Sequence, residues 1–251
     1  MPPLYRLNVE LANGDYGSLC TFEEMAGFYD STSEEQGMRR VDVLISSYLP
    51  GHLMARALPA PGSRSEDVTE LEVLGRDGTV LGRYVFFISR TERTPEGLSC
   101  SAFIAGHGPL PEEEEIWELH RSGPLAKPNL WSRFDRRGRR AWTQVALRRH
   151  DRAIRRSGTV FELDGTHVTE SAGFFCALGE AINGPGGYYG IGLDSLSDCM
   201  SGGFGTSGRF TLIWNDFQVA RRGWTLQEPP VPSLDETLAL LRSEAATVEL
   251  R

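Results

Sequence analysis

Alternating apolar and polar residues mark the first strands of the chain. Every second residue from Tyr5 to Leu11 is apolar, which is the period of a strand with one buried face. Around Asp77–Gly78 the segments 70–74 and 80–88 predict a hairpin, because both turn residues tolerate a positive φ. A further strand is expected over 41–48. The N-terminal part of the chain is therefore predicted to be mostly β.

Other segments interrupt this pattern. Residues 59–66 and 109–115 are rich in loop-forming residues. The second ends in four glutamates, which we expect to cap a short helix over 116–119, because carboxylates stabilise the positive end of a helix. The segment 142–147 is interpreted as an amphipathic strand. The sequence contains no phosphate-binding glycine loop, no nucleophile motif and no internal repeat.

Strands and helices alternate in the last third of the chain. Short apolar and β-branched runs predict strands over 159–163, 210–214 and 247–250. Helices are expected from Thr169 to Ile182, over 193–201, after Asn215 or Asp216, and from a capping box formed by Ser233 and Glu236. Strands that are separated by helices pair in parallel, so we expect an α/β domain with a three-stranded parallel sheet and about four helices.

Charge divides the chain in a similar way. The net charge is −8. Residues 157–251 carry 12 acidic residues and 5 arginines, whereas residues 1–156 carry 22 acidic and 21 basic residues. Within 133–156, ten arginines accompany two aspartates. We therefore expect two domains, 1–156 and 157–251, with an Arg-rich seam at the end of the first. The acidic second domain should attract basic partners and repel nucleic acid.

The composition, 40% hydrophobic and 24% charged, is that of a soluble globular protein. Neither a signal peptide nor an apolar run of about 18 residues is found, which predicts a cytoplasmic protein without a membrane contact. The four cysteines and five histidines form no CxxC or HxxxH pattern. The sequence thus predicts buried free thiols and neither a metal ion nor a cofactor.

The helix expected over 193–201 has one apolar and one acidic face. Asp194 and Asp198 stand four residues apart on the acidic face, beside Ser197 and Ser201. Two like charges at this spacing cost an isolated helix a few tenths of a kcal/mol, so selection for stability alone would not favour the pair. An ordinary solvated helix face is the simpler alternative. Tyr188 and Tyr189 immediately before the helix favour a protein-binding patch, because such patches combine rigid aromatic area with charge.

The string YYGxxLDxLxDC, from Tyr188 to Cys199, resembles the central segment of the barstar-type ribonuclease inhibitors. The strand over 210–214, followed by Asp216 and Phe217, and the closing helix and strand are similar to the same family. The resemblance covers 157–251 and does not extend to the first domain. It implies a barstar-like fold for the second domain.

The resemblance also implies a mode of action. In this family the helix enters the ribonuclease active site, with Asp198 taking the place of the substrate phosphate. Asp194 would be a second acidic contact, Tyr188 an aromatic one, and Glu244 is the candidate for the acidic contact from the last helix. The expected function is an intracellular inhibitor of a basic microbial ribonuclease, or a ribonuclease antitoxin, and not an enzyme.

The candidate partner-binding residues are Tyr188, Tyr189, Gly192, Asp194, Ser197, Asp198, Ser201 and Glu244. At three positions the chain departs from the family pattern: Gly192 stands for an asparagine, and Ser197 and Gly203 for tryptophans. These departures affect the expected target and affinity more than the expected fold.

Two other classes of function remain open. The Arg-rich seam 133–156 contains Phe134 and Trp142 and follows Trp131. Arginines beside these aromatic residues have the composition to contact phosphates and stack on bases, as in a nucleic-acid-associated regulatory protein. Asp194 and Asp198 would alternatively form the acid/base pair of an enzyme, which requires a cleft. Adjacent acids on a convex helix argue against that alternative.

Overall fold

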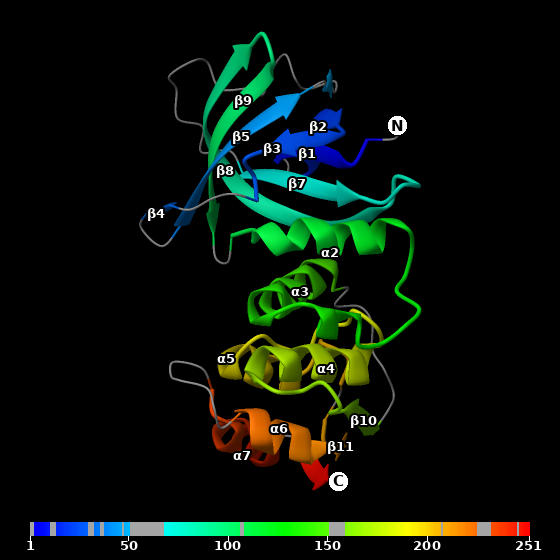
Figure 1. Ribbon diagram of the computed structural model, residues 1–251. Coiled ribbons are helices and arrows are strands. Elements are labelled where there is room, and N and C mark those ends of the chain that lie inside the picture. Colours follow the sequence, from blue (N-terminus) through cyan, green and yellow to red (C-terminus); the bar gives the residue numbers. More distant parts are fainter. Residues whose placement is uncertain are drawn as a thin grey trace. The chain divides into compact units, whose positions relative to one another are not determined.

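The fold is that of a computed structural model (Figure 1), which describes residues 3–10, 14–29, 33–35, 38–46, 48–50, 68–105, 108–150, 159–206, 208–224, 232–244 and 246–251. The change of charge along the sequence predicts a boundary after residue 156. The chain divides into two compact units, Met1–Pro124 and Leu125–Arg251, so residues 125–150 pack with the second unit. The domain boundary after residue 156 stays a prediction.

The first unit is built on an antiparallel sheet of nine strands among the described residues, in the order β3-β5-β9-β8-β7-β1-β2-β6 with β4 paired to β5 (Figure 1). The strands are β1 Tyr5–Glu10, β2 Tyr16–Phe22, β3 Glu24–Ala26, β4 Ser33–Glu35, β5 Met38–Ser46, β6 Leu49–Pro50, β7 Val68–Leu74, β8 Val80–Thr94 and β9 Gly97–Ala105. The prediction of a mostly β N-terminal part is confirmed.

The hairpin predicted around Asp77–Gly78 is formed by β7 and β8. Gly78 has a φ of 81°, and the Asp77 carboxylate accepts a hydrogen bond from the Thr79 N–H at 3.0 Å. The strand expected over 41–48 corresponds to β5, which ends at Ser46. The loop expected over 59–66 lies outside the described residues.

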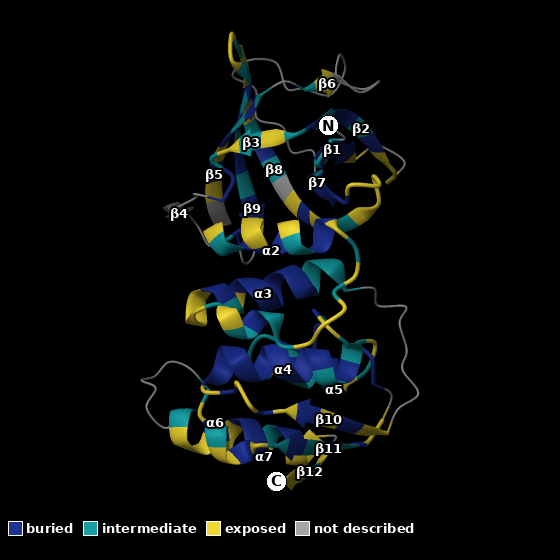
Figure 2. Ribbon diagram, turned by 45° about the vertical axis from the view of Figure 1, so that its right-hand side comes forward, coloured by how far each residue is buried: buried dark blue, intermediate teal, exposed yellow. Residues whose placement is uncertain are grey.

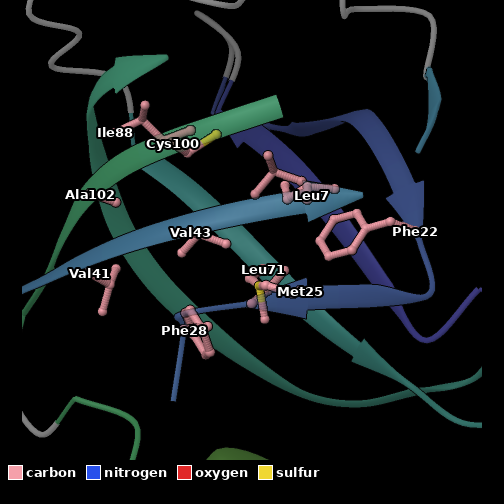
Figure 3. A pocket seen from close by; sticks show the side chains of 11 residues that line it. Leu7, Phe22, Met25, Phe28, Val41, Val43, Leu71, Ile88, Cys100 and Ala102 are labelled. Carbon is pink, nitrogen blue, oxygen red and sulfur yellow. The ribbon is translucent and has the colours of Figure 1, made fainter. Parts of the chain in front are cut away.

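The concave side of this sheet is filled by apolar side chains. Figure 3 shows Leu7, Phe22, Phe28 and Val43 gathered in the interior. The space that they leave is about 10 Å³, which is the room of roughly one water molecule. We therefore treat this region as the core of the first unit and not as a ligand site.

Helix α2, Pro111–Arg121, begins within the segment expected to be a loop. Proline is favoured at the first helical position, and Glu112, Glu113 and Glu114 lie in the first turn, where the helix dipole favours carboxylates. Residues 111–115, which were expected to be loop-like, therefore belong to the helix. Buried Arg121 ties the end of α2 to the sheet by donating to the Leu4 and Leu74 carbonyls, both at 3.3 Å.

The second unit contains the predicted parallel sheet, in the order β10-β11-β12. Its strands are β10 Val160–Asp164, β11 Phe210–Asn215 and β12 Ala246–Leu250. Its helices are η1 Leu130–Arg133, α3 Arg136–Arg149, α4 Ser171–Asn183, α5 Leu193–Met200, α6 Phe217–Gly223 and α7 Leu234–Glu244. Strands that are separated by helices thus pair in parallel, as the sequence predicts.

Two helix starts can be compared with the sequence. The capping box of α7 is present: Ser233 N donates to the Glu236 carboxylate at 2.8 Å, and Glu236 N donates to Ser233 Oγ at 3.1 Å. The N-cap of α4 is Glu170 and not Thr169. Its carboxylate accepts from the Ala172 and Gly173 N–H groups at 3.1 and 2.9 Å.

The strand predicted over 142–147 is wrong, because these residues belong to helix α3. The Asp135 carboxylate caps the helix by accepting from Gly138 N at 2.9 Å. The apolar residues Trp142, Val145 and Ala146 have the spacing of a helix face, and all three are buried. Short apolar runs permit either assignment until length and caps decide.

Helix α3 and the segment before it pack on α4, which is buried along most of its length (Figure 2). Asn129 N and Trp131 Nε1 donate to the Glu180 carboxylate at 2.8 and 3.2 Å. Arg139 pairs with the Glu170 carboxylate at 3.2 Å. These contacts explain why the second compact unit begins at Leu125.

All four cysteines are buried and free. Burial raises the pKa of the Cys20, Cys100 and Cys199 thiols to about 12, and it raises the pKa of Cys176 well above its usual value.

Because the thiolate is the reactive form, we expect the thiols of the native protein to react very slowly with a thiol reagent at pH 8. After denaturation, all four thiols should react. Rapid reaction of a native thiol would contradict this burial.

Candidate functional site

Helix α5 presents the predicted acidic face. Asp194 and Asp198 are exposed, four residues apart, while Leu196 and Met200 on the other face are 0% and 5% exposed. Leu193, the first residue of the helix, is half-buried. The helix is anchored by the buried residues Leu196, Cys199 and Met200 and leaves its carboxylates in solvent.

The N-terminus of α5 is stabilised by the side chain of Ser195, which the sequence analysis did not identify. Ser195 Oγ accepts from the N–H groups of Ile191 and Gly192 at 2.8 and 3.0 Å, and it lies 3.0 Å from the Gly192 carbonyl. Gly190 has a φ of 99°, and a Cβ there would lie 3.2 Å from the backbone of Leu196. Glycine is therefore required where the chain turns into the helix.

Helix α7 contributes a third carboxylate to this face. Ser197 Oγ lies 2.8 and 3.0 Å from the two carboxylate oxygens of Glu244, to which it donates. Glu244 is the last residue of α7 and is exposed. The structure thus brings together Asp194, Ser197, Asp198 and Glu244, which the sequence analysis named from separate segments.

The remaining candidates have structural positions around α5. Ser201 is the exposed C-cap, and its hydroxyl donates to the Ser197 carbonyl at 3.1 Å. Gly192 is the N-cap, and a Cβ added there would meet open space. We define the acidic face as Asp194, Ser197, Asp198, Ser201 and Glu244.

Tyr188 and Tyr189 are buried and lie outside the acidic face, so their assignment as partner contacts stays a prediction. They are 4% and 0% exposed. The Tyr189 hydroxyl lies 2.7 Å from Thr206 Oγ1, and burial raises its pKa. The sequence could not distinguish these roles, because tyrosine is equally suited to an interface and to a hydrogen-bonded core.

The acidic face presents the carboxylates of Asp194, Asp198 and Glu244 to solvent. Within the described residues, no arginine or lysine pairs with Asp194, Asp198 or Glu244. The same residues contain no cluster of three or more His, Cys, Asp and Glu suited to a metal ion. None of their helices is long and apolar enough to cross a membrane.

The fold and the exposed carboxylates define the second unit as an α/β domain with an acidic helix on its surface. Residues 158–248 match the family model Barstar, described as barnase inhibitor. The match confirms the resemblance predicted for the C-terminal domain, and residues 1–157 lie outside it. Searches of curated proteins and of solved structures gave no match.

The position of Asp198 should cost stability. It lies in the last turn of α5, where the helix dipole disfavours an anion, and four residues after Asp194. We expect Asp198→Asn to raise the thermal midpoint of the full chain by about 1–3 °C. Asp235→Asn, at an exposed carboxylate in the first turn of α7, is the matched control and should lower it. Calorimetry that shows the same sign for both variants would rule out this explanation.

Proposed function

We propose that the C-terminal unit is an intracellular inhibitor of a basic microbial ribonuclease of the barnase type. The observation that carries the proposal is the acidic face of α5 and α7, which has no cationic partner among the described residues and belongs to a domain that matches the Barstar family. Asp198 would occupy the place of the substrate phosphate, with Asp194 and Glu244 beside it.

The physical chemistry of ribonucleases supports this role. An enzyme that cleaves RNA gathers cationic donors around the phosphate, so an anion on a preformed helix can fill the same place. Long-range attraction between an acidic inhibitor and a basic enzyme also speeds their encounter. Residues 157–251 contain 12 acidic residues and 5 arginines, so their net charge is negative, as attraction to a basic enzyme requires.

Nucleic-acid binding through the seam 133–156 is the weaker alternative. Residues 136–149 of the seam form α3, which packs on α4. Arg139 is engaged by Glu170 and lies over the Trp131 ring, with its guanidinium carbon 5.4 Å from the ring centroid. Arg139 and Trp131 therefore serve the core of the second unit.

The first test is titration of the full chain into barnase while RNA cleavage is followed at two salt concentrations. We expect inhibition that reaches completion near one equivalent and weakens at high salt, because the paired charges are screened. The full chain should show no salt-sensitive binding to RNA without the enzyme. RNA binding without inhibition would contradict the proposal and favour the alternative.

Asp198→Ala tests the phosphate-mimic role within the same assay. We expect the dissociation constant to rise about thirty-fold or more, because a carboxylate that is desolvated against cations is lost. Glu162→Ala removes an exposed acid from β10, away from the acidic face, and should change the constant less than about three-fold. Equal small losses for both variants would exclude a special role for Asp198.

A further inference from the structure

We propose that His150 and Asn183 are positioning residues that hold α5 in its binding orientation. Neither belongs to the acidic face, and both act on the segments that flank the helix. The proposal rests on the inhibitor function proposed above, since it explains how the carboxylates are presented.

Asn183, the last residue of α4, joins the two ends of the α5 segment. Its side-chain amide donates to the carbonyl of Tyr188 at 2.7 Å and to the carbonyl of Phe204 at 2.9 Å. Tyr188 precedes α5 and Phe204 follows it. A single amide therefore closes the loop-helix-loop segment at its base.

His150 contacts the same two residues through their side chains. Its ring stacks on the Phe204 ring with a centroid distance of 5.0 Å and an interplanar angle of 16°. The Tyr188 ring is 6.0 Å from His150 and 5.8 Å from Phe204. We call His150, Asn183, Tyr188 and Phe204 the clasp.

The clasp makes the acidic helix depend on a segment that precedes the family domain. His150 is the C-cap of α3, and it lies before the matched range 158–248. Helix α3 is itself fixed on α4 by the Arg139–Glu170 pair. A helix of eight residues, as α5 is, is marginal by itself, so contacts at its flanks decide how rigidly its charges are presented.

The test compares His150→Ala, Asn183→Ala and His150→Phe in the full chain with barnase as the probe, by stopped-flow association and dissociation. We expect both alanine variants to raise the dissociation rate constant about ten-fold. The association rate constant and its salt dependence should be unchanged, because the surface charges remain. His150→Phe keeps the stacking ring and should behave as the wild type. Glu162→Ala, at an exposed residue of the same unit, is the control and should have no effect.

Hydrogen exchange of the free protein provides a measurement that does not need the enzyme. Both alanine variants should accelerate exchange in α5 but leave α4 and β11 protected. Wild-type dissociation rates in His150→Ala, or equal losses in His150→Ala and His150→Phe, would overturn the role of the stack. If the wild type fails to inhibit barnase, the proposed function fails. Accelerated exchange confined to α5 in the alanine variants would then still support the positioning role. Unchanged exchange in α5 would overturn it.

Discussion

The second unit depends on two carboxylates that cannot be left unpaired in its interior. Glu170 and Glu180 are 4% and 9% exposed, one before α4 and one within it. Burial raises the pKa of Glu180, and the N–H donors from Asn129, Gly186 and Trp131 oppose that effect. A buried charge without donors is costly, so the segment that supplies Asn129, Trp131 and Arg139 is part of the unit and not a linker to it.

This constraint connects the interior of the unit to the acidic face. Arg139 and Trp131 fix η1 and α3 against α4, and the C-cap of α3 then places His150 on Phe204. Helix α5 has only Leu196, Cys199 and Met200 buried. The orientation of α5 therefore depends on contacts made by the segments that precede and follow it. Rigid presentation of charge reduces the ordering cost that binding would otherwise incur.

Periodicity and local signals predicted much of the fold. The hairpin at Asp77–Gly78, the capping box at Ser233 and the alternation of strands and helices after residue 158 are all local, so the sequence shows them directly. The acidic pair on α5 could also be predicted from the sequence, because residues at positions i and i+4 are neighbours on any helix.

The sequence was least informative where a residue's role depends on distant partners. The segment 142–147 fits a strand as well as a helix, and its apolar face has a partner, α4, that is distant in the sequence. The unit boundary at Leu125 depends on pairs such as Arg139–Glu170, between residues that are 31 positions apart. Tyr188 and Tyr189 carry no local mark of burial, because their partners Phe204 and Thr206 follow after α5.

The composition of the acidic face explains why positioning matters in this chain. Its serines and carboxylates give the face little apolar area, so the binding free energy must come mainly from charge. A carboxylate contributes only if it meets its cation without a large loss of conformational freedom. Ser197 restrains Glu244 by a hydrogen bond, Ser195 closes the start of α5, and the clasp holds its base. These contacts restrict the conformational freedom of the carboxylates before a partner binds. Less conformational entropy is then lost on binding, which matters most for a surface that binds mainly through charge.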